Sequence, residues 1–535
     1  MHRHILDRWV VAGLLVVLAG CANLPRERGT PDVDEMIVAR GVPSPAWPTE
    51  ARSASSDEAR VAKLLSQPLT SERAVQLAFL KNPRIQVEYA RLGITHADLY
   101  EASRVTNPTF GYVDLSASGE GGSQLTRSVS LSFADLLLLR ARTRLARAEI
   151  ESVRHTVAAA LIELATEVET AWYEYVSAKQ VATMREAVAQ AAANSAEFAQ
   201  RSFDAGNIAP RNLALELAAE SEARIAATRT AAEAVRARTV LAGVLGISSR
   251  EQWDTPRKLP APLANDGMQD SLIAHALESR LDLEAVRREV SLLEDALGVT
   301  HRWRYLGAFR LGYERENETD GAHLHGPTLA LQLPIFNTGR GAVLRARAEL
   351  EESQARLASL ELAVRNEVAL GLDRVAAARE IAERYRTTLV PQREVVVQRE
   401  LERYNFMLGG VFELLQAKRA EFDAYQEYLE SVRDYWVART ELRRAAGGKL
   451  PGDEQKPEAT IGVEDVLTPN AKDMEGMEHS SVGHPTDHEA QPAAGREPVK
   501  DDSPRKEVPN GTLEPDAQHG DHPPEYGENL NGATP

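Results

Sequence analysis

The feature that most constrains the fold of this chain is a passage that occurs twice, about 200 residues apart. In residues 326–351, polar and apolar side chains alternate with a period of two up to Pro334, which predicts a strand that ends there. Gly339 and Gly341 then allow a sharp change of direction, and Ala, Arg, Leu and Glu follow at helical spacing. The sequence Ala-Arg-Ala-Glu within this helix also stands at 146–149, after a similar alternating run. The chain is therefore predicted to be one mainly α-helical architecture with some β-structure, built as two internal repeats.

Composition and the positions of proline and glycine divide the chain into six predicted segments. They are a signal peptide (1–20), an extended lipid-anchored tether (21–68), a first repeat (69–246), a Pro-rich connector (247–268), a second repeat (269–446) and a disordered acidic tail (447–535). The tether is inferred from its many prolines, and the tail from the loss of apolar periodicity.

Each repeat is predicted to contain a helix, a hairpin of strands, a long helix, a Gly-containing turn and a return helix. In the first repeat the helix begins at Thr70 or Ser71 and is broken at Asn82-Pro83. The expected strands are 109–118 and 126–133, and the expected long and return helices are 134–205 and 211–245. In the second repeat the corresponding elements are 269–301, 304–315, 326–336, 341–404 with a kink at Pro391, and 412–446.

Aromatic residues make up only 5% of the chain, while alanine, arginine, glutamate and leucine are abundant, which favours long helices over a compact mixed core. The formal net charge is −17, and the tail alone holds 19 acidic against seven basic residues, a net of −12. Nothing in this balance indicates binding of nucleic acid. The sequence also has no nucleophile elbow, phosphate-binding loop or metalloprotease motif, so no enzymatic activity and no cofactor are predicted.

The only cysteine, Cys21, follows a basic start and an apolar run too short to span a bilayer. Residues 18–21, Leu-Ala-Gly-Cys, resemble the lipobox of bacterial lipoproteins, which implies cleavage before Cys21 and its acylation. The alternative is an ordinary secretory signal with an incidental cysteine. The next residues lack the aspartate that retains such lipoproteins in the inner membrane, which favours the outer membrane.

Two hairpins give four strands of about ten residues, the length that spans a bacterial outer membrane in a β-barrel. Four strands cannot close, and an open edge in lipid would leave backbone N–H and C=O groups unpaired. Closure therefore requires several copies of the chain, and the sequence predicts an oligomer.

The twice-repeated order of helix, hairpin, long helix, Gly turn and return helix resembles the TolC-like outer-membrane efflux channel family over residues 69–446. The resemblance implies a homotrimer with a twelve-stranded barrel in the outer membrane and a helical tunnel through the periplasm. It also implies two partners, a periplasmic adaptor protein and an inner-membrane pump that supplies the energy, because the chain shows no nucleotide site or proton relay. Residues 404–415 and 427–436 look most like members associated with heavy-metal, especially copper, resistance.

The same resemblance implies a constriction at the periplasmic tip of the tunnel. By position, Tyr404 falls on a tyrosine that links neighbouring helices, and Glu413 falls on the first of two acids that face the pore. Gln416 occupies the place of the second acid, and Gly409 the place of an arginine that locks some members. Glu413 could equally be one more solvated charge on a helix.

The tail contains histidines and methionines beside many carboxylates, a combination that could collect copper or zinc ions. The candidate ligands are Met474, Met477, His479, His484 and His488, with His519 and His522 further on. His323 and His325 form a second, weaker candidate in what should be an external hairpin loop. Such groups are more often simply solvated.

Three functions remain open at this point. The first is a passive exit duct for small solutes or heavy-metal ions, and the second is the outlet of a protein-secretion system. The third is a structural lipoprotein that bridges the periplasm without conducting, which would have no need of two hairpins.

Overall fold

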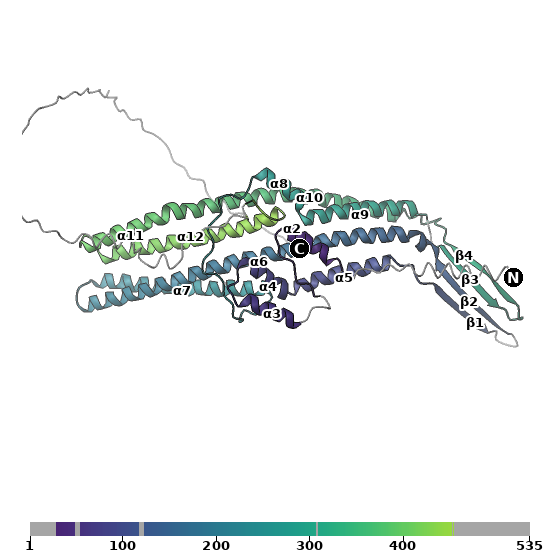
Figure 1. The fold of residues 1–535 in the computed structure, drawn as a ribbon, viewed down its shortest axis with the longest axis horizontal. Coiled ribbons are helices and arrows are strands. Elements are labelled where there is room, and N and C mark those ends of the chain that lie inside the picture. The colour runs from purple at the N-terminus through teal and green to yellow at the C-terminus, as the bar shows by residue number, and fades with distance from the viewer. Residues whose placement is uncertain (1–27, 49–53, 117–121, 306–308, 452, 454–535) are drawn as a thin grey trace, which may run out of the picture. The chain divides into compact units, whose positions relative to one another are not determined.

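The computed structural model describes residues 28–48, 54–116, 122–305, 309–451 and 453. All of them lie in one of the two units into which the chain divides, Met1–Ala471. Helices make up most of this part of the chain, and its four strands form one sheet at one end of the long helices (Figure 1). Among the described helices, none carries an apolar stretch long enough to cross a membrane.

The extended tether predicted for residues 21–68 is wrong where the structure describes it. Residues Thr30–Ala39 form helix α2 and residues Ala54–Leu65 form helix α3. Val33 and Ile37 of α2 are fully buried, and the helix packs against α6. The prolines misled the prediction because Pro31 lies in the first turn of α2, where a missing N–H costs no helical hydrogen bond.

The next helix begins where the sequence predicts. Thr70 is the N-cap of α4 (Ser71–Lys81), and its Oγ1 accepts a hydrogen bond of 3.3 Å from the backbone N–H of Arg73. The predicted break at Asn82-Pro83 separates α4 from α5 (Arg84–Ala102).

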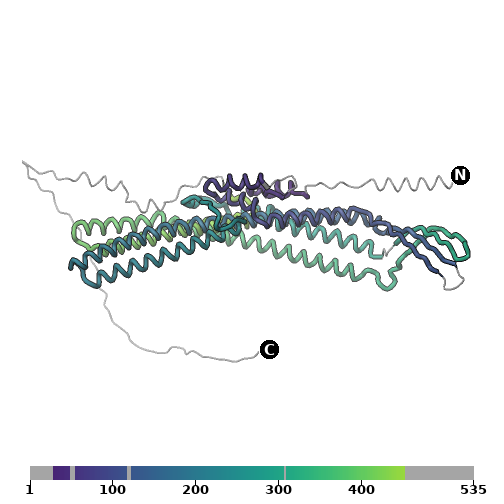
Figure 2. Tube along the Cα trace, turned by 90° about the horizontal axis from the view of Figure 1, so that it is seen from below, coloured from purple at the N-terminus to yellow at the C-terminus, as the bar shows by residue number. Residues whose placement is uncertain are grey.

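The first long helix is also confirmed. After β1 (Thr109–Ser116) and β2 (Ser123–Ser132), α6 (Phe133–Asp204) runs for 72 residues, which at ~1.5 Å per residue is about 108 Å. Gly206, with φ +76°, makes the turn, and Pro210 occupies the first position of the return helix α7 (Pro210–Leu245). In Figure 2, α6 and α7 run beside each other to a shared turn, and their contacts confirm that they pack together.

The single helix predicted at 269–301 is in fact two helices, α8 (Gln269–Ser279) and α9 (Leu281–Trp303). Arg280 between them has an extended backbone (φ −67°, ψ 123°) and is buried. Its guanidinium pairs with Asp282 and Glu367, each at 2.6 Å, so the side chain is held inward at the break. The helical periodicity on both sides concealed this interruption.

The second long helix is interrupted at the predicted place. After β3 (Phe309–Asn317) and β4 (His323–Leu331), α10 (Arg340–Arg384) is followed by the π-helical segment η1 (Tyr385–Leu389) and α11 (Val390–Asn405). Pro391 lies in the first turn of α11. A proline removes one helical hydrogen bond and its ring crowds the preceding turn, and the wider π turn accommodates both effects. The return helix α12 (Val411–Ala445) completes the order.

The sheet has the strand order β1-β2-β3-β4 and is antiparallel throughout. The two hairpins are therefore joined, with Leu131 of β2 directly opposite Leu311 of β3. The predicted strand bounds shift by several residues, because β3 and β4 meet across a turn at residues 318–322. His323 and His325 consequently lie in β4 and not in the loop expected for them, which corrects that prediction.

The Pro-rich connector packs on the helices in the middle of the chain. Trp436 of α12 stacks on Tyr173 of α6 at 5.4 Å, and its indole N–H donates to the Pro260 carbonyl at 2.6 Å. Asp266 of the connector is almost fully buried between Arg379 (3.1 Å) and Arg439 (2.8 Å). This buried charge cluster ties the connector to α10 and α12.

The disordered tail predicted from residue 447 begins too early. Leu450 is only 4% exposed, and Asp453 Oδ1 lies 2.6 Å from Arg439 Nη2. These first residues pack because leucine and aspartate meet an apolar surface and a buried cation, features that composition alone does not reveal. The remainder of the tail lies outside the described residues.

Candidate functional site

The two faces of the sheet differ in chemistry. Side chains alternate between faces along a strand, and residues paired across antiparallel strands share a face. One face, here called the apolar face, carries Phe110, Tyr112, Val129, Leu131, Leu311, Tyr313, Pro327, Leu329 and Leu331. Phe110 and Leu329 are 66% and 63% exposed, a large exposure for side chains that normally lie in a core. The apolar face therefore needs an apolar environment that a single chain in water lacks.

The opposite face, here called the polar face, is lined mainly by small and hydrophilic side chains. They are Gln124, Thr126, Ser128, Ser130, Ser132, Glu314, Glu316 and Thr328. Gln124 donates a hydrogen bond to Glu316, and a Cβ at Gly312 would meet Thr328 Oγ1 at 2.7 Å, so this side is closely packed. Only Val113, Leu115 and Leu324, near the strand turns, are large apolar exceptions. One wet and one apolar face is the pattern of a membrane barrel strand.

The far ends of the helical hairpins carry different surfaces. The turn between α6 and α7 is formed mainly by small and polar residues. The turn between α11 and α12 instead exposes three apolar side chains, Phe406 at 75%, Met407 at 94% and Leu408 at 72%. Met407 has a positive φ of 56°, which is rare for such a residue and places its side chain at the apex of the turn.

Both predicted gate residues lie at this second turn. Tyr404 is near the end of α11 and 42% exposed, and Glu413 is an exposed residue in the first turn of α12. Among the described residues, neither the Tyr404 hydroxyl nor the Glu413 carboxylate has a hydrogen-bond or ion-pair partner. The carboxylate of Glu413 lies over Gly410, where an added Cβ would meet Oε2 at 2.5 Å. Glu413 lies in the first turn of α12, where the partial positive charge of the helix N-terminus favours a negative side chain.

Two ion pairs join the α6–α7 hairpin to α12 at positions further along α12 from this turn. Arg185 of α6 contacts Asp423 at 2.8 Å and donates to Gln426 Oε1 at 2.5 Å. Closer to the turn, Arg419 faces Glu216 of α7 at the longer distance of 3.9 Å. Between the two links lies a groove of about 260 Å³, with alanines on one side and Lys418, Arg419 and Phe422 on the other.

A buried acid, Glu421, lies in the same part of α12 as the residues that line this groove. Glu421 is 5% exposed, with the Lys418 ammonium beside it. Burial raises the pKa of Glu421 above the usual value for glutamate, Lys418 opposes this change, and nearby Glu394 of α11 adds to it. The hydroxyl of Tyr425 donates to Glu394, so these four residues connect α11 and α12 through polar contacts.

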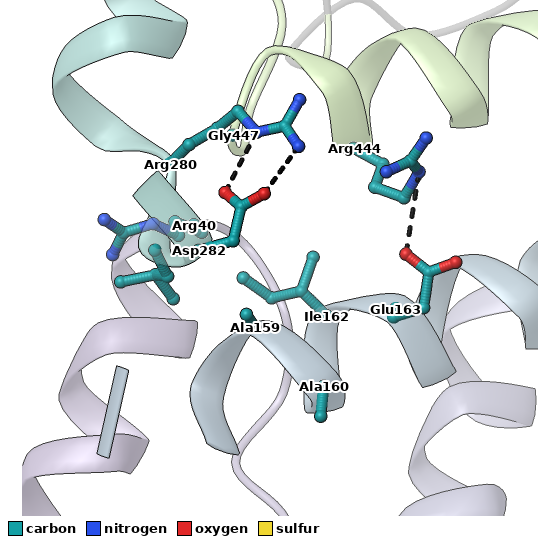
Figure 3. A pocket seen from close by; sticks show the side chains of 10 residues that line it. Arg40, Ala159, Ala160, Ile162, Glu163, Arg280, Asp282, Arg444 and Gly447 are labelled. Atoms are coloured by element: carbon teal, nitrogen blue, oxygen red, sulfur yellow. Dashed lines mark hydrogen bonds and ion pairs between the residues drawn. The ribbon is translucent and has the colours of Figure 1, made fainter. Parts of the chain in front are cut away.

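A second charged cavity, of about 250 Å³, lies where α2, α6, α9 and the end of α12 meet (Figure 3). In Figure 3 the Arg280 guanidinium faces the Asp282 carboxylate, and Arg444 reaches down to Glu163 at 3.6 Å. Arg40 points away from Arg444 and donates to the carbonyl of Ser279. The cavity walls are thus already engaged in holding helices together.

The structure leaves several predicted site residues untested. Cys21 and the tail candidates Met474, Met477, His479, His484 and His488 lie outside the described residues. Within the described part of the chain, no group of three or more His, Cys, Asp or Glu side chains is placed to hold a metal ion. The links made by Arg185 and Arg419 were missed, because no local pattern marks pairs that lie more than 200 residues apart.

Comparison with known proteins relates part of this chain to a family. A family model described as "Outer membrane efflux protein" matches residues 272–448. The cobalt-zinc-cadmium resistance protein CzcC of Cupriavidus metallidurans is 22% identical over 392 residues, which cover 71% of this chain and 90% of CzcC. Protein CyaE of Bordetella pertussis is 24% identical over 466 residues, which cover 83% of this chain and 96% of CyaE.

The fold has solved counterparts. The crystal structure of CusC, described in relation to transmembrane channel formation, matches with a TM-score of 0.60 at 14% identity, over 71% of this chain and 92% of CusC. The sheet with its two chemically distinct faces and the long paired helices agree with the family match to the second half of the chain. Residues 272–448 therefore match the outer membrane efflux protein family, and the fold of the described chain is similar to the folds of solved outer-membrane channel proteins.

Proposed function

We propose that three copies of this chain assemble into one channel, with a twelve-stranded barrel in the outer membrane and a helical tunnel in the periplasm. The observation that carries the proposal is the four-stranded sheet, which leaves β1 and β4 as open edges. Joining β4 of one copy to β1 of the next pairs these backbone groups, as lipid requires. The recurring order of elements on either side of the connector supports a duplicated origin for the two halves.

The proposed barrel places the apolar face toward lipid and the polar face toward the lumen. Large aromatic side chains stand near the helix end of the sheet, where Trp303, Tyr305 and Phe336 are 37%, 56% and 101% exposed. Aromatic residues favour the boundary between lipid and water, so these three fit the periplasmic edge of the barrel. Acylation of Cys21 would add a separate lipid anchor.

The energy for export is proposed to come from an inner-membrane pump, reached through a periplasmic adaptor. Phe406, Met407 and Leu408 at the α11–α12 turn offer the adaptor an exposed apolar contact. Tyr404 and Glu413 lie at the same turn, so the proposed gate and the proposed contact are adjacent. Binding of the adaptor could then be coupled to opening of the tunnel.

The proposed cargo is heavy-metal ions. Support comes from the similarity to CzcC, whose name records cobalt, zinc and cadmium resistance, and from the resemblance of residues 404–415 to metal-resistance members. The His- and Met-containing tail would collect such ions on the periplasmic side. Titration calorimetry with Cu(I), Cu(II) and Zn(II) on the full chain and on a chain ending at Asp453 tests the tail, and equal binding by both removes its proposed role.

Light scattering of the detergent-solubilised full chain tests the proposed assembly. The expected result is a single species with the mass of three protein chains and an intact β signal by circular dichroism. A monodisperse monomer with the same β signal would overturn the proposed barrel. It would instead favour a strut that bridges the periplasm without conducting.

A further inference from the structure

One row of residues crosses all four strands of the sheet. The pairing register aligns Tyr112 with Arg127, Arg127 with Arg315, and Arg315 with His325. Paired residues share a face, so this row, here called the basic row, belongs to the apolar face. The ring of His325 lies 6.3 Å from the ring of Tyr313, another residue of that face, which agrees with this orientation.

The two arginines at the centre of the basic row are like charges placed side by side. Arg127 and Arg315 are direct partners on the two inner strands, a geometry that brings Cβ atoms to about 4.5–5.5 Å and is destabilising for like charges. Both side chains are exposed, and neither forms an ion pair with another described residue. The acid nearest by register on this face, Asp114, is diagonal to Arg127 and lies 3.5 Å from the Tyr112 hydroxyl. The pair therefore lacks a counter-charge within the described chain.

The position of the basic row along the strands is also informative. On the apolar face, the alternate residues 309, 311 and 313 of β3 and 327, 329 and 331 of β4 form an apolar band nearest the helices. The basic row is the next row toward the strand turns. The helices leave the sheet at its opposite end (Figure 1). With the helices in the periplasm, the basic row would lie at the outer boundary of the lipid, where headgroups replace acyl chains.

We propose that the basic row binds the phosphate groups of an anionic glycolipid in the outer leaflet of the outer membrane. Two adjacent guanidinium groups offer forked donors that match phosphate oxygens, and His325 adds a donor at one side. A phosphate between Arg127 and Arg315 would convert their repulsion into two attractive contacts, in surroundings where acyl chains reduce screening by water. This inference rests on the proposed barrel, because only that assembly faces the row toward lipid.

The test uses the full-length protein in detergent and bisphosphorylated lipid A as the probe. Binding of lipid A is measured by native mass spectrometry for wild type and for the Arg127→Gln, Arg315→Gln double variant. Arg310→Gln is the matched control, because Arg310 is an exposed arginine of the same strand that points to the polar face at the helix end. The double variant Arg127→Lys, Arg315→Lys keeps the charge and loses the forked donor geometry.

The expected result is a Kd for lipid A that rises about tenfold or more in the double glutamine variant and less in the lysine variant, because each charge-assisted hydrogen bond contributes substantially. Arg310→Gln should bind as wild type does. Dephosphorylated lipid A should bind wild type as weakly as bisphosphorylated lipid A binds the double glutamine variant. Equal binding of lipid A by wild type and the double variant would overturn the inference, as would full competition by millimolar inorganic phosphate.

Incorporation into vesicles separates this inference from the proposed function. Each variant is reconstituted, and membrane insertion is scored by flotation and by protection of the strands from added protease. If trimers insert and the double glutamine variant binds lipid A as wild type does, only the proposed binding of lipid by the basic row is refuted. Failure of wild type to insert refutes the barrel and with it the lipid-facing position of the row.

Discussion

The guanidinium of Arg185 on α6 lies 2.8 Å from the carboxylate of Asp423 on α12, and this ion pair joins two helical hairpins whose residues are far apart in sequence. Arg185 is only 17% exposed and also donates to Gln426, so its position is fixed by two partners. Among the described residues, the next charged link toward the turn is the longer one from Arg419 to Glu216. The Arg185 link is therefore the contact that best resists separation of the hairpins near the proposed gate.

Arg185→Ala is expected to loosen the closed tip. Asp423 is 63% exposed, so the link contributes only about 1 kcal/mol after screening, which corresponds to about a fivefold rise in open probability. Single-channel recording measures this quantity. Arg236→Ala is the control, because the ion pair that Arg236 forms among the described residues is with Glu233, within α7 itself. An unchanged open probability in Arg185→Ala, or an equal rise in the control, would remove the proposed role of the link.

Glu413→Gln is expected to reduce cation selectivity with little loss of stability, because an exposed side chain contributes little packing. In a trimer, three carboxylates near the axis would attract cations into a narrow ring. Reversal potentials in asymmetric salt measure the selectivity. Gln416→Glu provides the opposite change, since Gln416 lies one turn further along α12 and is also exposed. If neither substitution moves the reversal potential, Glu413 lies outside the pore and is a solvated helix charge.

Truncation of the tail is expected to have effects that depend on where the chain ends. A chain ending at Asp453 should unfold at the same temperature as the full chain. A chain ending at Ala446 loses the buried Leu450 side chain and Asp453, one of the two carboxylate partners of Arg439, and should be about 2–4 kcal/mol less stable. Thermal unfolding followed by circular dichroism distinguishes the two. Equal melting of both truncated chains would show that residues 447–453 do not stabilise the fold.

Glu421→Gln is expected to stabilise the protein at pH 7 and to be nearly neutral at pH 4. Burial raises the pKa of Glu421, so the folded state holds the proton more tightly than the unfolded chain does. This contribution to stability is fully present below the ordinary glutamate pKa and is lost as pH rises through the raised folded-state pKa. Glutamine removes that loss because it does not ionise.

Melting temperatures at the two pH values check this expectation, with the exposed Glu427→Gln as the control. A Glu421→Gln variant that melts below wild type at pH 7 would mean that the Lys418 pairing outweighs the cost of burying the charge.

The elements of the fold could largely be predicted because they follow from local chemistry. The 72-residue helix α6 contains no proline or glycine, and Thr70, Gly206 and Pro391 mark boundaries by their own conformational preferences. Local chemistry misled the prediction at Pro31, where the proline opens a helix, and at Arg280, where a distant ion pair holds a break inside a helical pattern.

The candidate site could be predicted only in part, because its contacts join distant parts of the chain. The position of Tyr404 and Glu413 beside one turn followed from the family resemblance. The Arg185–Asp423 link and the pairing of Arg127 with Arg315 depend on how α6 meets α12 and on the register of β2 against β3. No spacing in the sequence encodes either arrangement.

The claim that three copies form one conducting channel is tested most directly by recording currents after adding the purified trimer to a planar lipid bilayer in symmetric salt. The account predicts discrete conductance steps of one main size, each marking the insertion of one trimer, with more frequent opening in Arg185→Ala. Trimers that insert into the bilayer but give no steps above baseline, in wild type and in Arg185→Ala alike, would contradict it.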